Sequence, residues 1–332
     1  MTSPPKNLLE VNAFGLYCAV GDFYIDPWKP VDYAVLTHAH SDHARSGSGN
    51  YLAHTMSANI LTHRLGAINL QTVRYGEPVV RNGVRISLHP AGHIPGSAQV
   101  RVEQKGEIWV VSGDYKLGSD GISAPFEPQK CHVFISESTF GLPVYKWESQ
   151  LDVFESIQNW WSANRSLGRA SVIAGYSLGK AQRILKNLNS ETGRIYCHGS
   201  VSASNEALEA SGLSLPPWER IDPGTKKDSY AGAMIICPPS ALGSTWMKRF
   251  GSYSTGYCSG WMSVRGARRR RAVDRGFVLS DHADWDSLLI AVKETTASRV
   301  LITHGYSAAF SRYLREKGYD SQELQTLYGE EE

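Results

Sequence analysis

Residues 32–43 read D-Y-A-V-L-T-H-A-H-S-D-H, a short apolar run that stops at three histidines and one aspartate. The apolar run predicts a buried strand. Side chains alternate in extended backbone, so His38 and His40 should point the same way, while Asp42 and His43 can turn toward a neighbouring position. Imidazole and carboxylate ligands together suit zinc, manganese or iron but not calcium. The stretch therefore predicts a metal site directly after a strand.

Four clustered groups cannot fill two metal sites, so further ligands have to come from other parts of the chain. Three candidates each follow a predicted strand and have a glycine neighbour: His93 in A-G-H, Asp114 in S-G-D-Y and His304 in T-H-G. Glycine at a strand end lets a loop approach a metal closely. Packing these titratable groups together without a cation would be costly, which favours a metal centre. Five other histidines are expected to be structural: His54, His63, His89, His132 and His198.

The motifs H-x-H-x-D-H, a later H, G-D and a late H-G occur in the order in which they occur in metallo-β-lactamase hydrolases, and the chain resembles that superfamily over nearly its whole length. The resemblance implies an α/β fold, the αββα sandwich, and two divalent metal ions, Zn²⁺ or Mn²⁺. It implies that Asp114 bridges the two ions. The implied ligands of one ion are His38, His40, His93 and Asp114. Those of the other are Asp42, His43, His304 and Asp114.

About 190 residues separate Asp114 from His304. Within them, I-S-E-S-T-F-G resembles the first β-CASP motif, with Glu137 as its acidic residue, and L-S-D-H-A-D resembles the second, with His282. His304 doubles as the third. The resemblance implies an inserted β-CASP α/β domain, which caps the metal site in that family. The predicted domains are 1–144 and 272–332 for the two parts of the metallo-β-lactamase domain and 145–271 for the insertion.

Strand-like and helix-like segments alternate in the predicted insertion, which is typical of a small parallel α/β domain. Ser149 is a suitable N-cap for a helix over Gln150–Ala163. The segments that follow are Ser171–Ala174, Gly179–Leu188, Arg194–Cys197, Ser204–Ala210 and Ala233–Cys237. After the insertion the prediction is two strands and two helices: Gly276–Leu279, Trp285–Lys293, Val300–Ile302 and Ala308–Lys317.

A phosphodiesterase needs a nucleophile, charge neutralisation on the phosphate and a proton for the leaving oxygen. Two metals would supply the first two, and His282 is the candidate general acid, because imidazole titrates near neutrality. Glu137 would orient it, and Asp42 is counted as both a ligand and a catalytic residue. Asp284 has an alternative role as the cap of the following helix. Asp26 could support the histidine cluster, but a turn role is favoured.

Two segments are candidates for substrate binding. G-Y-S-L-G-K, residues 175–180, joins a strand to a helix, where backbone amides favour an anion and Ser177 and Lys180 could add contacts. It is similar to the corresponding turn of DNA cross-link repair nucleases. A basic run could line a phosphate-binding groove, although such runs are usually solvated. Its central members are Arg268, Arg269, Arg270 and Arg271.

Residues 259–285 look most like bacterial ligase-associated DNA exonucleases. That resemblance implies DNA as substrate, a DNA repair role, 5′ to 3′ digestion, and a DNA ligase and a helicase as partners. His304 favours the alternative of RNA, because RNA-acting members of the family have histidine at that position. A small-molecule hydrolase would need neither the insertion nor the arginine run. A non-catalytic nucleic-acid-binding protein would not need a complete set of ligands.

Composition sets the remaining expectations. The chain has 332 residues and a net charge of +2, so any nucleic-acid surface must come from local clusters of charge. Its five cysteines are odd in number and never occur as C-x-x-C, which favours reduced, buried thiols in a cytoplasmic protein. No secretory signal or membrane-spanning stretch is predicted.

Overall fold

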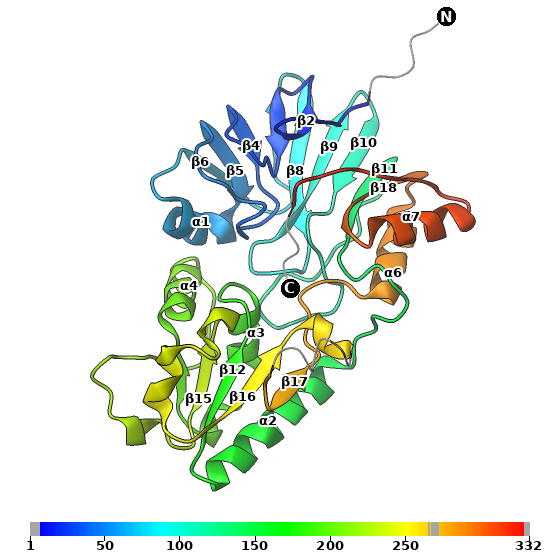
Figure 1. Ribbon diagram of the computed structural model, residues 1–332. Helices are drawn as coiled ribbons and strands as arrows, with labels where there is room; N and C mark the ends of the chain where they lie inside the picture. The colour runs from blue at the N-terminus through cyan, green and yellow to red at the C-terminus, as the bar shows by residue number, and fades with distance from the viewer. Residues whose placement is uncertain (1–6, 265, 267–271, 329–332) are drawn as a thin grey trace, which may run out of the picture. The chain divides into compact units, whose positions relative to one another are not determined.

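The computed structural model describes residues 7–264, 266 and 272–328 (Figure 1). These residues form two compact units. Unit 1 contains 7–119, 123–144 and 282–328, and unit 2 contains 120–122 together with the described part of 145–281. Within the described residues, no helix has the length and apolar character needed to cross a membrane.

Unit 1 contains two sheets. The strands of the first run in sequence order: β1 (Glu10–Asn12), β2 (Gly15–Cys18), β3 (Phe23–Ile25), β4 (Tyr33–Val35), β5 (Asn50–His54) and β6 (Leu70–Val73). β2 and β3 form an antiparallel hairpin around Gly21-Asp22, with Cys18 opposite Phe23. From β3 to β6 the neighbours are parallel.

The second sheet of unit 1 has seven strands in the order β19-β18-β11-β10-β9-β8-β7. Along the chain they are β7 (Pro78–Arg81), β8 (Val84–Pro90), β9 (Ala98–Gln104), β10 (Glu107–Val111), β11 (Val133–Ser138), β18 (Arg299–Gly305) and β19 (Asp320–Glu323). β7 to β10 form an antiparallel meander, whereas β10, β11 and β18 are parallel neighbours. β11, which precedes the insertion, therefore lies next to β18, which follows it.

The two sheets of unit 1 share one apolar core, to which Phe23 and Val35 come from the first sheet and Val100 and Ile135 from the second. Alternate residues of the second sheet, such as Phe134, face away from that core and pack against helices α6 (Trp285–Thr295) and α7 (Ser307–Glu316). Figure 1 shows both helices beside β18. A short helix, α1 (Ala58–Leu65), follows β5. This layering is the predicted α/β sandwich.

Unit 2 is built on a six-stranded sheet whose neighbours are all parallel. The order is β14 (Glu219–Arg220), β13 (Ile195–Cys197), β15 (Met234–Cys237), β12 (Ala170–Ala174), β16 (Tyr253–Cys258) and β17 (Arg275–Phe277). All five residues of β12 are buried, because a central parallel strand is covered on both faces. The alternation of strands and helices in the sequence predicted this arrangement.

Different elements cover the two faces of the unit 2 sheet. On one face lie the helices α2 (Gln150–Ser166), α3 (Lys180–Asn187) and α4 (Gly199–Ala210), which bury side chains such as Trp161 and Ile184. The other face is covered by 3-10 turns, η3 (Lys227–Tyr230) and η5 (Thr245–Phe250) among them, which bury Tyr230 and Phe250.

The chain leaves unit 2 between Asp281 and His282, later than the predicted boundary at 271/272. The reason is β17, which pairs with β16 at the edge of the unit 2 sheet. β16 itself was not predicted. Gly256 interrupts its pattern, and the structure explains the glycine, because a Cβ there would lie 3.1 Å from the rings of Phe277 and Trp160.

Candidate metal centre and its neighbouring histidine

The functional side chains of unit 1 gather where strands end. β10, β11 and β18 are parallel neighbours, so their carboxyl ends share one edge of the sheet, where Asp114, Glu137 and His304 lie. Gly113 allows the loop after β10 to approach the loop after β4. Its φ is +55°, and a Cβ there would lie 2.6 Å from the Cβ of Thr37. No other residue type would bring Asp114 so close to the histidine motif.

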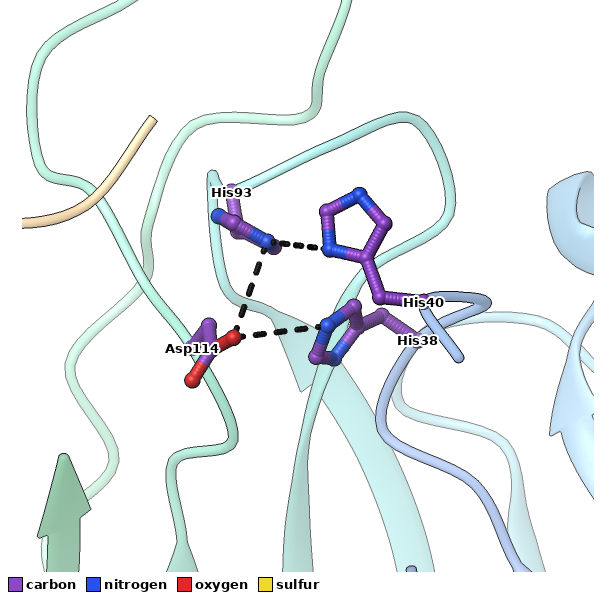
Figure 2. A group of neighbouring side chains, drawn as sticks. All are labelled: His38, His40, His93 and Asp114. Carbon is purple, nitrogen blue, oxygen red and sulfur yellow. Dashed lines mark hydrogen bonds and ion pairs between the residues drawn. The ribbon is translucent and has the colours of Figure 1, made fainter. Parts of the chain in front are cut away.

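Figure 2 shows the first predicted ligand group as a set of neighbouring side chains. Its four members, all buried, offer ligand atoms within 4.8 Å of one another: His38, His40, His93 and Asp114. The Oδ2 atom of Asp114 lies 3.4 Å from His38 Nε2 and 3.8 Å from His93 Nε2. The Nδ1 atom of His40 lies 3.1 Å from His93 Nε2.

The second predicted group surrounds the same carboxylate. The Nε2 atom of His43 lies 3.6 Å from Asp114 Oδ2 and 3.5 Å from Asp42 Oδ2. On the other side, His304 Nε2 lies 3.2 Å from Asp114 Oδ1. Asp114 therefore lies against imidazoles of both predicted groups, through Oδ2 to His38, His93 and His43 and through Oδ1 to His304, as expected of a bridging ligand.

Asp26 contacts this cluster through His43. It is buried, with 1% of its surface exposed, and its Oδ2 atom lies 2.7 Å from His43 Nδ1. Its carboxylate also accepts hydrogen bonds from the amide and the hydroxyl of Thr37, the residue that precedes the histidine motif. The backbone of Asp26 has a φ of +44°, so the residue does occupy a turn. The favoured interpretation as a turn residue only was nevertheless wrong, because the same residue orients a histidine.

Charge and burial set the protonation of the site. Burial lowers the pKa of His38 well below its usual range, so that imidazole is neutral and able to bind a cation. Burial alone would also lower the pKa of His43, yet nearby carboxylates raise it well above its usual range. Burial would raise the pKa of Asp114, but His43 and His282 hold it well below its usual range. The site therefore favours a carboxylate paired with positive charge.

The donor set fits a bound cation. The Nε2 atoms of His38 and His43 are buried and make no hydrogen bond to any residue that the structure describes. Since Asp26 binds the Nδ1 atom of His43, Nε2 is the nitrogen left for a ligand bond. Asp26, Asp42 and Asp114 bring three buried carboxylates to the cluster. Burial of so much negative charge requires compensation, which a divalent cation would supply.

His282 lies beside this cluster and is held by Glu137. Its Nδ1 atom lies 3.0 Å from both carboxylate oxygens of Glu137, and its ring centroid lies 4.7 Å from that of His93. Glu137 is itself fixed by the Tyr115 amide at 2.8 Å and by the amide and hydroxyl of Thr139. Burial would raise the pKa of Glu137, but His282 lowers it. The pair is thus an oriented imidazole with an ionised partner.

Asp284 has the capping role that the sequence left open. Its Oδ1 atom accepts a hydrogen bond of 2.9 Å from the Ser287 amide at the start of α6. The residue between it and His282 is also fixed, since the Ala283 amide donates to the Tyr115 carbonyl at 2.7 Å. The segment that carries His282 is therefore tied down on its C-terminal side within unit 1.

The predicted substrate-binding residues fall in unit 2 or outside the described residues. Ser177 lies before α3, with its hydroxyl 2.8 Å from that of Ser200. Lys180 is not at the surface: none of its surface is exposed, and its Nζ atom lies 3.8 Å from Asp281 Oδ2. The structure therefore does not present its ammonium group to a ligand as predicted. The run Arg268, Arg269, Arg270 and Arg271 lies outside the described residues.

Tyr328 is a further neighbour of the site that the sequence did not reveal. Its ring stacks on His43, with centroids 4.6 Å apart and an interplanar angle of 11°. It also makes an edge contact with the ring of Trp28. A single aromatic residue near the end of the chain carries no pattern from which such a contact can be predicted.

No family model matches the chain. Among known proteins, it is 31% identical to the probable DNA ligase of Opitutus terrae over 92% of this chain and 30% of that protein. It is 27% identical to the RNase aCSPSF2 of Saccharolobus solfataricus over 36% of this chain and 25% of that protein. It is 23% identical to the DNA cross-link repair protein SNM1 of Arabidopsis thaliana over 62% of this chain and 43% of that protein. The chain thus spans less than half the length of each of these relatives.

A crystal structure of a protein of unknown function from Enterococcus faecalis has the same fold, with a TM-score of 0.62, 12% identity and coverage of 90% of this chain and 80% of that one. The two-sheet unit with its histidine-rich strand ends is that of the metallo-β-lactamase superfamily. Within the superfamily, the insertion and the relatives show that the chain belongs to the β-CASP proteins.

Proposed function

We propose that the protein is a metal-dependent phosphodiesterase that acts as a DNA exonuclease in DNA repair, digesting from 5′ to 3′. One observation carries the proposal. A buried group of side chains able to hold a metal ion lies beside a histidine that is held by a carboxylate, with the rings of His93 and His282 4.7 Å apart. Phosphodiester hydrolysis needs both parts, since phosphate charge must be offset and a leaving oxygen must be protonated.

Two ions would be held around Asp114. His38, His40 and His93 would complete one set of ligands, and Asp42, His43 and His304 would complete the other. Imidazole and carboxylate donors suit Zn²⁺ or Mn²⁺. When bound, such ions offset the charge of the phosphate and make a hydroxide nucleophile available near neutral pH.

His282 would supply the proton. Its Nδ1–H group donates a hydrogen bond to the Glu137 carboxylate, so Nε2 is the nitrogen that can transfer a proton. The ionised Glu137 stabilises the protonated imidazole and fixes its orientation. In this scheme His282 Nε2–H protonates the oxygen that leaves the phosphorus, and the imidazole is left neutral.

DNA is the proposed substrate because two relatives point to it. A relative named as a probable DNA ligase matches over 92% of this chain, and another is named as a DNA cross-link repair protein. The same similarity supports a DNA ligase as a working partner, with a helicase as a second. The cytoplasm is the proposed place of action, which suits five buried free cysteines.

RNA is the second candidate, and His304 favours it. This histidine faces Asp114 and also occupies the third β-CASP position, and one relative is named as an RNase. Both substrates would use the same metal centre and the same His282.

Digestion of matched single-stranded DNA and RNA tests the proposal. Each polymer is labelled separately at its 5′ and 3′ ends and incubated with Zn²⁺ or Mn²⁺, with Asp114→Ala as the control. Early release of the labelled 5′ nucleotide from DNA, absent in the variant, is expected. Preferential cleavage of RNA would replace the DNA assignment. Hydrolysis of a chromogenic lactam without cleavage of either polymer would overturn the nuclease proposal.

A further inference from the structure

Unit 2 contains a buried cluster of charge that the chemistry above does not use. Lys180 and Arg183 lie on α3, and Asp281 is the last residue before the chain leaves the unit. Their exposed fractions are 0%, 6% and 4%. Charged side chains are rarely buried to this extent unless they are paired, and these three are paired with one another.

The cluster holds both oxygens of one carboxylate and the main chain beside it. The Nη1 atom of Arg183 donates to Asp281 Oδ1 at 3.0 Å and to the Ser280 carbonyl at 2.6 Å. On the other oxygen, Lys180 Nζ lies 3.8 Å from Asp281 Oδ2. The guanidinium group of Arg183 is oriented by a further hydrogen bond, which its Nε atom donates to Gln150 Oε1 at 2.8 Å. Ser280 and Asp281 are therefore held by three contacts, two from Arg183 and one from Lys180.

Local sequence builds this arrangement. Lys180 and Arg183 are three residues apart on α3, so they lie on the same face of the helix. Gly175 leaves room for the lysine stem, because a Cβ there would lie 3.0 Å from Lys180 Cγ. Gln182 fixes the start of the helix by accepting the Gly179 amide at 2.7 Å. The G-Y-S-L-G-K turn thus serves to bury Lys180 rather than to expose it.

Asp281 is joined directly to His282, so the anchored residues are the two that lead into the general acid. On its other side, His282 is followed by Ala283, whose amide is bonded to Tyr115. We propose that Lys180, Arg183 and Asp281 are positioning residues, which restrict the backbone that carries His282 and so hold its imidazole in line with the leaving oxygen. We call Lys180, Arg183 and Asp281 the anchor. This inference rests on the proposed function, because the anchor would act on catalysis only through His282.

A double-mutant cycle tests whether the anchor acts through His282. Arg183→Lys keeps the charge but loses the fork that holds two acceptors, and Asp281→Asn keeps the size of the side chain. Each is made in the wild-type chain and in His282→Ala, and kcat and KM are measured on the DNA substrate. Arg220→Lys is the matched control, since the Arg220 side chain forms an exposed ion pair with Glu206 in the same unit.

In the wild-type chain, kcat should fall by up to about 10²-fold with KM nearly unchanged, because a small displacement of a catalytic group is enough for such a loss. In the His282→Ala chain the same substitutions should have almost no effect, since the group they position is gone. An equal loss of kcat in both backgrounds would show a purely structural role and overturn the proposal. Unchanged kcat in the wild-type background would do the same.

Amide hydrogen exchange provides a measurement that does not depend on activity. Exchange in 279–284 should become faster in Arg183→Lys and Asp281→Asn than in the wild type or in Arg220→Lys, because the anchor no longer restrains that segment. If exchange there stays unchanged, the anchor is wrong. If exchange rises but the wild-type protein cleaves neither DNA nor RNA, the proposed function fails and the anchor stands only as a restraint on 280–282.

Discussion

The Nδ1 atom of His43 lies 2.7 Å from Oδ2 of Asp26, a residue 17 positions earlier in the chain. Because the same carboxylate binds the amide and hydroxyl of Thr37, it fixes both ends of the histidine motif at once. Hydrogen bonds of this kind set the orientation and basicity of a metal-binding imidazole. Asp26 should therefore control metal affinity although it is not itself a predicted ligand.

Asp26→Asn is expected to lower metal affinity by about 10–100-fold, the range typical for loss of a partner behind a ligand. Asparagine tolerates the left-handed backbone at this position, so the fold should survive. Zn²⁺ affinity would be measured by competition with a chelator. Asp22→Asn is the control, since Asp22 has a similar φ of +53° but lies in the exposed hairpin. Equal affinities of Asp26→Asn and the wild type would contradict the role.

Asp114→Ala is expected to lose both bound metal and nuclease activity, because its two oxygens face both sets of histidines. Metal content after dialysis would be measured by elemental analysis beside activity. Asp284→Asn serves as the control, since Asp284 caps α6 and asparagine also caps helices. Full metal content in Asp114→Ala would remove this residue from the centre.

His282→Ala should separate chemistry from metal binding. It is expected to keep its metal and lose about 10²–10⁴-fold in kcat, the usual contribution of a general acid. Glu137→Gln should lose part of the same factor, because the amide cannot stabilise a protonated imidazole. Single-turnover cleavage under saturating metal gives both values. Normal turnover by His282→Ala would show that another group protonates the leaving oxygen.

The arginine run predicts a salt-dependent contact with the phosphate backbone. Replacement of Arg268, Arg269, Arg270 and Arg271 by glutamine should weaken DNA binding and reduce the slope of log Kd against log salt concentration, by up to about 0.7 for each lost contact with single-stranded DNA. Binding would be followed by fluorescence anisotropy with the Asp114→Ala variant, so that the substrate stays intact. A slope unchanged by the four substitutions would place the run away from the bound strand.

His54 should make the fold sensitive to mild acid. Burial lowers its pKa to about 4, whereas an unfolded chain has a histidine pKa of about 6.5. The unfolded state therefore binds more protons between these values, and stability falls as pH decreases through that window. His54→Phe keeps a ring to stack on Tyr75 but cannot titrate. Urea unfolding at pH 7 and pH 4 should show a smaller loss of stability in the variant; an equal loss would contradict the assignment.

Much of this site could be predicted because its parts are local in sequence. The spacing of His38, His40, Asp42 and His43 alone predicts a metal site. His93, Asp114 and His304 stand out because each follows a strand and has a glycine neighbour. Asp114 and His304 meet because β10, β11 and β18 are parallel neighbours, whereas His93 follows β8, which is antiparallel to β9. The parallel sheet of unit 2 was predictable for the same reason, since strands and helices alternate visibly in the sequence.

The parts that could not be predicted depend on contacts between distant residues. Asp26 reads as a turn residue because it is one, and only the fold shows what its carboxylate touches. Lys180 resembles a phosphate-binding lysine until Asp281, about 100 residues later, is placed beside it. β16 was missed because Gly256 breaks a strand pattern for a reason found in Trp160 and Phe277.

The position of unit 2 in the chain also sets an order of assembly during synthesis. The group of His38, His40, His93 and Asp114 is complete within the first 114 residues, whereas His282 and His304 emerge only after the whole of unit 2. Glu137 precedes its partner His282 by 145 positions in the chain. A nascent or interrupted chain that ends inside unit 2 therefore has the residues proposed to hold one cation but lacks the proposed proton donor, so the proposed nuclease activity requires synthesis to continue beyond unit 2.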